Sequence, residues 1–208
     1  TGTNGKTTTT LLTYHLLKDA GLDVGLGGNI GTSFARQVAN GDKEYFVLEM
    51  SSFQLDNCVT FKPYISVLCN ITEDHLDRYD YKFENYINSK FSITKNQNED
   101  DFFIYCQDDK VTMDYLYKVN PKVQKIPFSY HQKVSNGAYV HNQEIIIELN
   151  KTNFNMPISE LQIQGMHNSY NSMAAAISAK LLGVRNDRIR ESLEDFKNLE
   201  HRLEFVAT

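Results

Sequence analysis

The 208-residue chain has the composition of an ordinary folded protein, since 41% of its residues are hydrophobic and 23% are charged. Its formal net charge of −5 argues against a broad nucleic-acid-binding surface. No apolar run approaches the roughly 18 residues that a membrane span needs. The three cysteines are far apart in the sequence, which argues against a disulfide framework. The length allows one substantial core, or one domain plus an appendage. We expect a cytoplasmic protein with no nucleic-acid partner and no membrane insertion.

Apolar periodicity predicts alternating helices and strands over the first half of the chain. Each expected helix carries apolar residues on one face, and each expected strand is a short apolar run. This alternation predicts an α/β fold with a parallel sheet built from βαβ units and flanked by helices. The expected helices cover residues 6–20, 32–39 and 83–95, and the expected strands begin at Val24 and cover residues 45–49, 64–69 and 102–106.

The pattern changes after about residue 120. Residues 123–164 hold short strand-like pieces separated by Asn-rich turns. They predict a small, mainly antiparallel sheet added to the main one. Two helices, over residues 168–182 and 187–197, are expected to close the chain, and Gly183 supplies the stop between them.

The opening stretch GTNGKTT has the pattern of a phosphate-binding loop. Glycines let backbone N–H groups turn toward phosphate oxygens, and the helix that follows directs its positive end at the same anion. Lys6 would reach the β- and γ-phosphates, and the Thr7 hydroxyl would bind Mg²⁺. The alternative is a Gly/Thr turn that caps a helix. The residues expected at the nucleotide are Gly2, Thr3, Asn4, Gly5, Lys6, Thr7 and Thr8.

Acidic side chains follow two of the expected strands, where an open α/β sheet binds its ligands. Glu49 ends the first of these strands and is a candidate Mg²⁺ ligand, or else an exposed strand-end glutamate. Glu73, Asp74, His75 and Asp77 follow the next strand, either as a second metal site or as a solvated acidic turn. Two sites at neighbouring strand ends predict two Mg²⁺ ions, which would neutralise phosphate charge.

Taken together, these stretches resemble the Mur ligases, the ATP-dependent amide-forming enzymes of peptidoglycan synthesis. GTNGKTT and DHLD are shared widely in that superfamily, including the folylpolyglutamate synthetases. GLGGNIG, LEMSSFQL and NITEDHLDRY are narrower, and their combination is similar to the branch that adds D-glutamate to UDP-N-acetylmuramoyl-L-alanine. The alternatives are another enzyme of the superfamily, such as a folylpolyglutamate synthetase, and a nucleotide-binding regulatory module without chemistry.

The resemblance covers residues 1–208 as a central, P-loop mononucleotide-binding domain. It implies an N-terminal UDP-binding domain and a C-terminal amino-acid-binding domain outside this chain, together with the strand that precedes the phosphate loop. It also implies an ADP-forming ligase reaction through an acyl-phosphate intermediate.

The resemblance assigns Lys6, His75 and Lys90 as catalytic residues. It implies that Thr7 and Glu49 bind the first Mg²⁺, and that His75 and a CO₂-derived carbamate on Lys90 bind the second. In the expected helix, Lys90 stands at the edge of the apolar stripe. Burial there would lower its pKa and free the neutral amine that reacts with CO₂. Without the resemblance, an ordinary surface lysine is the alternative.

The remaining site residues also come from the resemblance. Asn29, Ser51 and His75 are expected to approach the muramoyl-alanine end of the substrate.

Asn168 and Asn171 lie three residues apart at the start of a helix and are expected at the adenine, unless they only cap that helix. Arg202, beside His201, is expected to contact the nucleotide. Glu200 stands where relatives often carry proline, which leaves the local turn open.

Overall fold

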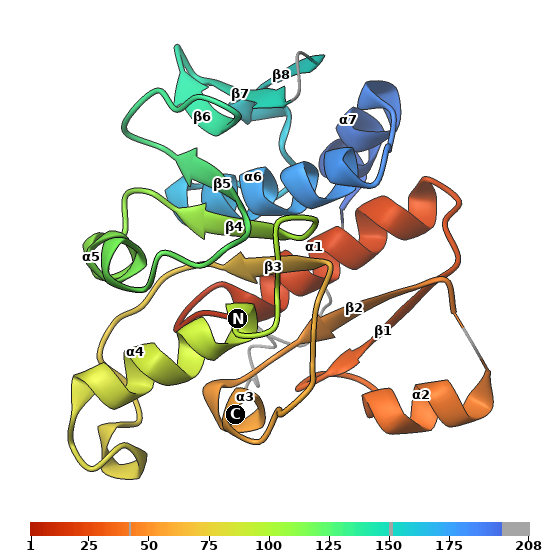
Figure 1. Ribbon diagram of the computed structural model, residues 1–208. Coiled ribbons are helices and arrows are strands. Elements are labelled where there is room, and N and C mark those ends of the chain that lie inside the picture. The colour runs from red at the N-terminus through yellow and green to blue at the C-terminus, as the bar shows by residue number, and fades with distance from the viewer. Residues whose placement is uncertain (42, 150–151, 197–208) are drawn as a thin grey trace, which may run out of the picture.

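A six-stranded sheet forms the middle of the protein in the computed structural model, which describes residues 1–41, 43–149 and 152–196 (Figure 1). Its strands lie side by side in chain order; β3 to β6 run parallel, and β6 to β8 run antiparallel. The strands are β3 (Ile65–Leu68), β4 (Phe102–Cys106), β5 (Gln124–Ser129), β6 (Gly137–His141), β7 (Glu144–Leu149) and β8 (Thr152–Pro157). The α/β class and the mostly parallel sheet are confirmed.

The antiparallel strands extend this main sheet, which confirms the antiparallel addition that the sequence predicted for the second half of the chain. The turn between β6 and β7 explains their direction. Its two residues, Asn142 and Gln143, both have positive φ, 49° and 62°. Such two-residue turns match the right-handed twist of a hairpin, and a connection this short joins only antiparallel strands.

Helices cover both faces of the main sheet (Figure 1). One face carries α1 (Lys6–Asp19), α6 (Met166–Leu181) and α7 (Asn186–Asp195), and the other carries α4 (Phe83–Phe91) and α5 (Lys110–Val119). No helix within the described part of the chain is both long and apolar enough to cross a membrane.

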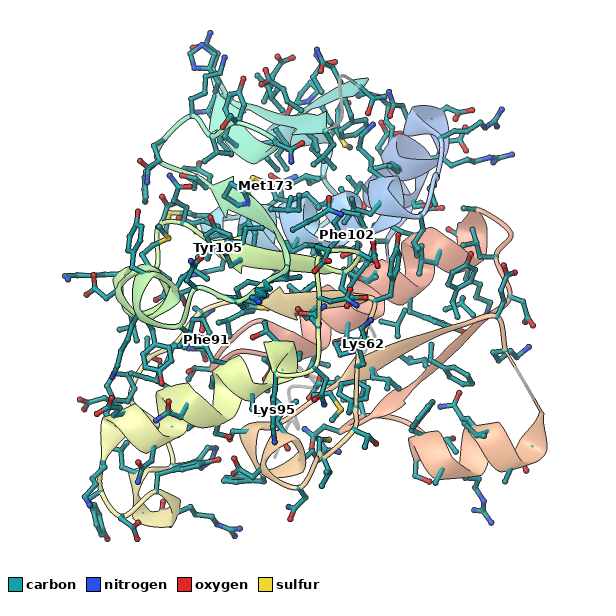
Figure 2. All side chains as sticks on the ribbon, viewed as in Figure 1. Lys62, Phe91, Lys95, Phe102, Tyr105 and Met173 are labelled. Atoms are coloured by element: carbon teal, nitrogen blue, oxygen red, sulfur yellow. The ribbon has the colours of Figure 1, made fainter. Side chains whose placement is uncertain are left out.

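The protein has one hydrophobic core on each face of the main sheet, and strand β4 contributes side chains to both. All five residues of β4 are therefore buried. Phe102 packs in the core that contains Met173 of α6, whereas Tyr105 packs in the core that contains Phe91 of α4 (Figure 2). Side chains alternate along a strand, so a strand covered by helices on both faces is apolar throughout.

A second, two-stranded parallel sheet lies beside the main one, formed by β1 (Val24–Gly28) and β2 (Tyr45–Glu49), with α2 (Phe34–Asn40) next to β1. An apolar cavity of about 360 Å³ separates β2 from β3. In the described residues β2 pairs with β1 and β3 pairs with β4. This cavity explains why the first four residues of β2 are only partly buried, although the sequence predicted a buried strand.

Other element boundaries differ only slightly from the sequence prediction. The helix expected over residues 83–95 is α-helical to Phe91 and continues as a 3₁₀ turn, Ser92–Thr94. Two short helices, α3 (Ser52–Asp56) and α5, were not predicted. Helix α3 begins with a capping box between Ser51 and Gln54, a signal that the sequence does contain.

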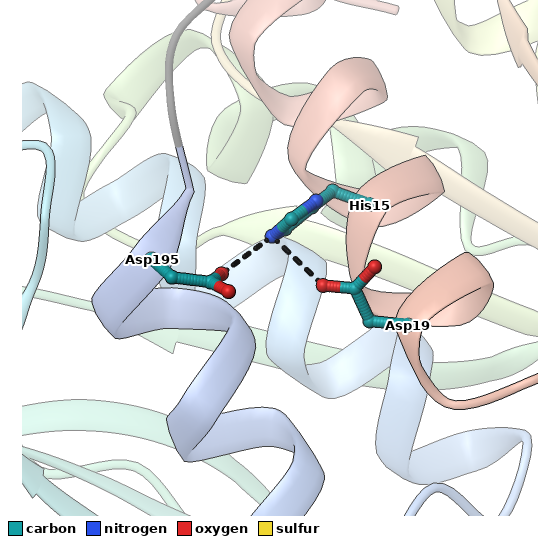
Figure 3. A group of neighbouring side chains, drawn as sticks. All are labelled: His15, Asp19 and Asp195. Atoms are coloured by element: carbon teal, nitrogen blue, oxygen red, sulfur yellow. Dashed lines mark hydrogen bonds and ion pairs between the residues drawn. The ribbon is translucent and has the colours of Figure 1, made fainter.

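Helix α7 is tied to α1 by one imidazole (Figure 3). His15 Nε2 lies 2.8 Å from Asp195 Oδ1 and 3.1 Å from Asp19 Oδ2. Its ring also packs against Phe196, with ring centroids 5.4 Å apart.

Gly28 is the last residue of β1 and pairs with Glu49 of β2. We expect its replacement by alanine to destabilise the folded protein. Its φ is 96°, and a Cβ there would lie 2.2 Å from the carbonyl oxygen of Glu49. Gly21 has a similar φ of 86°, but no heavy atom would lie within 4 Å of its Cβ. Gly21→Ala should therefore lower the free energy of unfolding by about 1–2 kcal/mol, the backbone penalty alone. Gly28→Ala should lower it by clearly more, because β1 and β2 must separate. Urea unfolding of both variants measures the difference, and equal losses would contradict the close approach.

Candidate nucleotide and metal site

The phosphate loop, residues 2–8, is anchored along the carboxyl end of β3. The amino group of Thr1 donates to Val67 O (2.8 Å), and Cys69 N donates to Thr1 O (3.0 Å). Thr3 N continues this pairing by donating to Asn70 O (2.9 Å). The loop therefore begins at the sheet edge where α/β proteins bind their ligands.

Side chains from the segment after β3 fix the shape of the loop. Asn4 N donates to Asn70 Oδ1 (2.9 Å), and Asn70 Nδ2 donates to Asn4 O (3.2 Å). Thr3 Oγ1 accepts a hydrogen bond from Thr72 N (3.0 Å). These bonds hold the loop in one conformation without any ligand.

The end of the loop has the geometry of an anion cradle. Gly5 precedes α1 with φ 78° and places no side chain across the helix N-terminus. A Cβ at Gly5 would lie 2.6 Å from Asn171 Oδ1. Lys6 Nζ donates to Thr3 O (2.8 Å), so its charge lies over the loop. A helix N-terminus, a glycine and a nearby cation together fit a phosphate group.

Glu49, at the carboxyl end of β2, is 2% exposed. Asn29 Nδ2 donates to its Oε1 (2.9 Å), whereas its Oε2 is buried and has no hydrogen-bond partner among the described residues. This burial excludes the exposed strand-end glutamate. An unpaired carboxylate oxygen in the interior is costly, and a bound cation would satisfy it. The residue therefore fits a metal ligand, and Asn29 fixes its direction.

His75 lies in the segment after β3, with φ 50° and a side chain that is 52% exposed. Its Nε2 is 3.4 Å from Asp74 Oδ2, and its ring packs edge-on against Phe53 at 5.2 Å. Glu73 and Asp77 are exposed. The segment does not gather these carboxylates and the imidazole into a three-ligand group. In the described residues the one such group, with ligand atoms within 4.8 Å of one another, is the His15 cluster of Figure 3.

Lys90 is buried under the phosphate loop, with 1% of its surface exposed. Its Nζ donates to Gly2 O (2.8 Å) and lies 4.5 Å from the centre of the Tyr86 ring. Burial, helped by the nearby charge of Lys6, lowers the pKa of Lys90 from 10.5 to about 7. The burial expected from the sequence is confirmed, and an ordinary surface lysine is excluded.

The two asparagines of α6 differ in their surroundings. Asn171 is buried, accepts a hydrogen bond from Thr9 Oγ1 (3.1 Å) and donates to Asn168 Oδ1 (3.3 Å). Asn168 Nδ2 donates to Gln164 O (2.9 Å) and is less buried. The residue at the helix N-cap is Gly165, so neither asparagine is the cap. Asn171 supports the phosphate loop, and Asn168 remains the one closer to solvent.

Of the other expected site residues, Asn29 and Ser51 lie in the described part of the chain. Ser51 caps α3, and Asn29 follows β1, so both lie at strand ends beside Glu49. The expected nucleotide contact Arg202, with His201 and Glu200, lies outside the described residues.

Asp108, at the end of β4, was missed by the sequence analysis. It accepts hydrogen bonds from Tyr170 Oη (2.7 Å), Ser129 Oγ (2.7 Å) and Tyr130 N (2.6 Å). Burial and the bond to Asp108 raise the pKa of Tyr170 well above its usual value. The network fastens the start of α6 to the sheet edge. The signal was available, because Asp108 follows an apolar strand just as Glu49 does.

Comparison with known proteins identifies the family of this chain. Residues 1–179 match the family described as the Mur ligase middle domain. The chain belongs to the Mur ligase middle-domain family. This match confirms the family that the sequence motifs predicted.

Two similar members of the Mur ligase family share one name. The UDP-N-acetylmuramoylalanine–D-glutamate ligase of Christiangramia forsetii is 55% identical over 206 residues, which is 99% of this chain and 46% of that protein. The protein of that name from Bacteroides fragilis is 51% identical over 207 residues, again 46% of its length. The chain thus spans about half the length of these relatives.

Solved structures of other Mur ligases have the same fold. MurF from Acinetobacter baumannii matches all of this chain and 47% of its own with a TM-score of 0.74 at 18% identity. A UDP-N-acetylmuramate:L-alanyl-gamma-D-glutamyl-meso-diaminopimelate ligase from Neisseria meningitides matches 96% of this chain and 65% of its own with a TM-score of 0.72 at 21% identity.

The lowered pKa of Lys90 predicts a pH-dependent stability. Because the unfolded chain holds this proton up to about pH 10.5 and the folded chain only up to about pH 7, folding releases a proton in that window. The penalty of burying the charge is complete below pH 7 and decreases as the pH rises. Wild type should therefore gain up to about 1.4 kcal/mol per pH unit relative to Lys90→Met above pH 7.

Urea unfolding in CO₂-depleted buffer between about pH 6 and pH 9.5 measures this slope. Lys95→Met, which removes an exposed lysine of the same segment, is the control and should show no such slope relative to wild type. Parallel stability curves for wild type and Lys90→Met would contradict the lowered pKa.

Proposed function

We propose that this chain is the ATP-binding domain of a longer ligase that joins D-glutamate to UDP-N-acetylmuramoyl-L-alanine, with ATP converted to ADP and phosphate. The observation that carries the proposal is the buried amine of Lys90 directly under a phosphate loop. A simple nucleotide-binding module gains nothing from that burial. The shared name of relatives at 55% and 51% identity supports the choice of substrates.

Amide formation requires an activated carboxyl group. In the proposed reaction, an oxygen of the alanyl carboxylate attacks the γ-phosphorus of ATP and expels ADP, which gives an acyl phosphate. The amine of D-glutamate then attacks the acyl carbon, loses a proton and expels phosphate. This chemistry needs no serine or cysteine nucleophile. The protein contributes positioning and charge, and Lys6 would follow the transferring phosphoryl group.

The candidate ligands would hold two Mg²⁺ ions. Thr7 and Glu49 would bind the first ion, in keeping with the unpaired Oε2 of Glu49. His75 and the carbamate of Lys90 would bind the second. When bound, Mg²⁺ would offset the negative charge of the phosphates.

Lys90 would acquire its carbamate without another protein group. Its amine is largely neutral just above its pKa of about 7. The nitrogen lone pair attacks the carbon of CO₂, a C–N bond forms, and one proton leaves for solvent. The product is an anion on a long stem, a ligand that unmodified side chains do not provide at this depth.

The remaining site residues divide between the two substrates. Asn29 and Ser51, at the ends next to Glu49, would face the muramoyl-alanine part, together with His75. Asn168 would approach the adenine, with Asn171 holding the loop behind it.

Arg202, by resemblance to the family, would contact the nucleotide.

We also propose that the longer protein completes this domain. The cavity between β2 and β3 is lined by both strand edges, and Thr1 already pairs with β3 at one end of it. A strand that precedes Thr1 would fill the cavity and join the two sheets. An N-terminal domain for the UDP part and a C-terminal domain for D-glutamate would account for the remaining length of the relatives.

The test is a phosphate-release and product assay on the full-length protein. UDP-N-acetylmuramoyl-L-alanine with D-glutamate should give amide product, and L-glutamate should be at least about 100-fold poorer, equivalent to about 2.7 kcal/mol. The 208-residue chain alone should form no product and serves as a control. Activity with L-glutamate on a folate, and none on the UDP-linked substrate, would refute the proposed substrates.

A further inference from the structure

Three aromatic rings connect His75 to Lys90. The imidazole of His75 packs against Phe53 at 5.2 Å, and Phe53 stacks on Tyr79 at 6.0 Å with an interplanar angle of 11°. Tyr79 meets Tyr86 edge-on at 5.3 Å, and the Tyr86 ring lies 4.5 Å from Lys90 Nζ. We call the three rings Phe53, Tyr79 and Tyr86 the aromatic row. It joins the two groups that would share the second metal ion.

Tyr79, in the middle of the row, is held at both its ring and its hydroxyl. The residue is 8% exposed. Its hydroxyl donates to Asp56 Oδ2 (2.9 Å) and also lies 3.2 Å from Ser89 Oγ. Ser89 Oγ in turn donates to Ser52 O (2.9 Å). One side chain therefore bonds to α3 and α4 at the same time.

These bonds join three of the four segments that carry the candidate metal ligands; the phosphate loop with Thr7 is the fourth. Helix α3 starts three residues after Glu49, and Ser89 directly precedes Lys90 in α4. Tyr79 itself follows His75 by four residues. A shift of Tyr79 would move these segments relative to one another.

His75 needs such support because its own surroundings hold it weakly. Its side chain is half exposed, and its backbone is in the left-handed region, which is strained for a residue with a Cβ. Phe53 supplies its ring contact, and the guanidinium of Arg78 covers Phe53 at 4.9 Å. The direction of the imidazole thus depends on Phe53, and the position of Phe53 depends on Tyr79.

We propose that Tyr79 is a positioning residue: through the aromatic row it fixes the His75 imidazole relative to the Lys90 amine, and so holds the two candidate ligands of the second divalent cation in place. This inference rests on the proposed function for the identity of the two ligands. The geometry that it invokes is a property of the metal-free protein and is tested there.

The full-length, metal-free protein provides the first readout. The His75 ring proton signals, assigned by their loss in His75→Gln, should carry a ring-current shift from Phe53. Tyr79→Leu should move these signals toward the positions of an unfolded chain. Tyr79→Phe, which keeps the ring and loses the two hydroxyl contacts, should move them less. Tyr81→Leu is the matched control, because Tyr81 is two residues away and 79% exposed, and it should leave the signals in place.

Mn²⁺ binding in the presence of a non-hydrolysable ATP analogue provides the second readout. Tyr79→Leu should weaken the weaker of two Mn²⁺ sites by about tenfold or more, and Tyr79→Phe by less, with the stronger site unchanged. A tyrosine that only fills the core would not distinguish the two sites. Wild-type His75 signals and Mn²⁺ affinities in folded Tyr79→Leu would overturn the proposal. If Tyr79→Leu does not fold, Tyr79→Phe decides in the same way.

The experiments distinguish a failure of the proposed function from a failure of the positioning role of Tyr79. If the wild-type protein forms no amide product but the His75 signals still depend on Tyr79, the proposed function is wrong and the positioning role stands. If the wild type is active and neither Tyr79 variant changes the signals or the weaker Mn²⁺ site, the positioning role is wrong and the proposed function stands.

Discussion

The site depends most on one hydrogen bond, in which the buried amine of Lys90 donates to the backbone of the phosphate loop. The amine reaches Gly2 O at 2.8 Å from α4, 88 residues away along the chain. Taking a cation out of water costs free energy, and the nearby charge of Lys6 adds to the cost. Such a lysine either neutralises or finds an anionic partner, and its pKa of about 7 means that small changes in its surroundings decide which. Tyr86 links this amine to the loop again, since its hydroxyl lies 3.2 Å from Thr3 Oγ1.

Two other groups of the site are also energetically unfavourable in the folded protein. Glu49 holds one buried carboxylate oxygen that has no hydrogen-bond partner in the described part of the chain, and His75 adopts a left-handed backbone. Both lie at carboxyl ends of strands, where βαβ connections bring distant segments to one edge. Backbone strain and unpaired buried groups cluster at functional sites in proteins, which supports the ligand-binding role proposed for this edge. Phosphates and divalent cations together match the charges that these residues leave uncompensated.

The sequence was informative wherever structure is set locally. The phosphate loop, helix α1 and the apolar strand β4 follow from glycine placement and periodicity, and the position of Lys90 beside an apolar stripe correctly indicated burial. Contacts between remote segments left no local pattern. Asn171 holds the first turns of α1 through Thr9 Oγ1, 162 residues away, although the sequence suggested only a contact with adenine or a helix cap. Likewise, no local signal shows that β2 and β3 face a cavity.

Chemical rescue of a Lys90 variant tests the central role of this residue most directly. In the full-length enzyme, Lys90→Ala should lose most activity, and acetate or formate should restore part of it by placing a carboxylate in the vacated space. Chloride at matched ionic strength should not. Lys90→Arg should stay inactive with or without the acids, since a guanidinium fills the space, remains cationic and does not react with CO₂. Near-full activity of Lys90→Ala in CO₂-depleted buffer, without any added carboxylate, would contradict the carbamate and reduce Lys90 to a buried structural lysine.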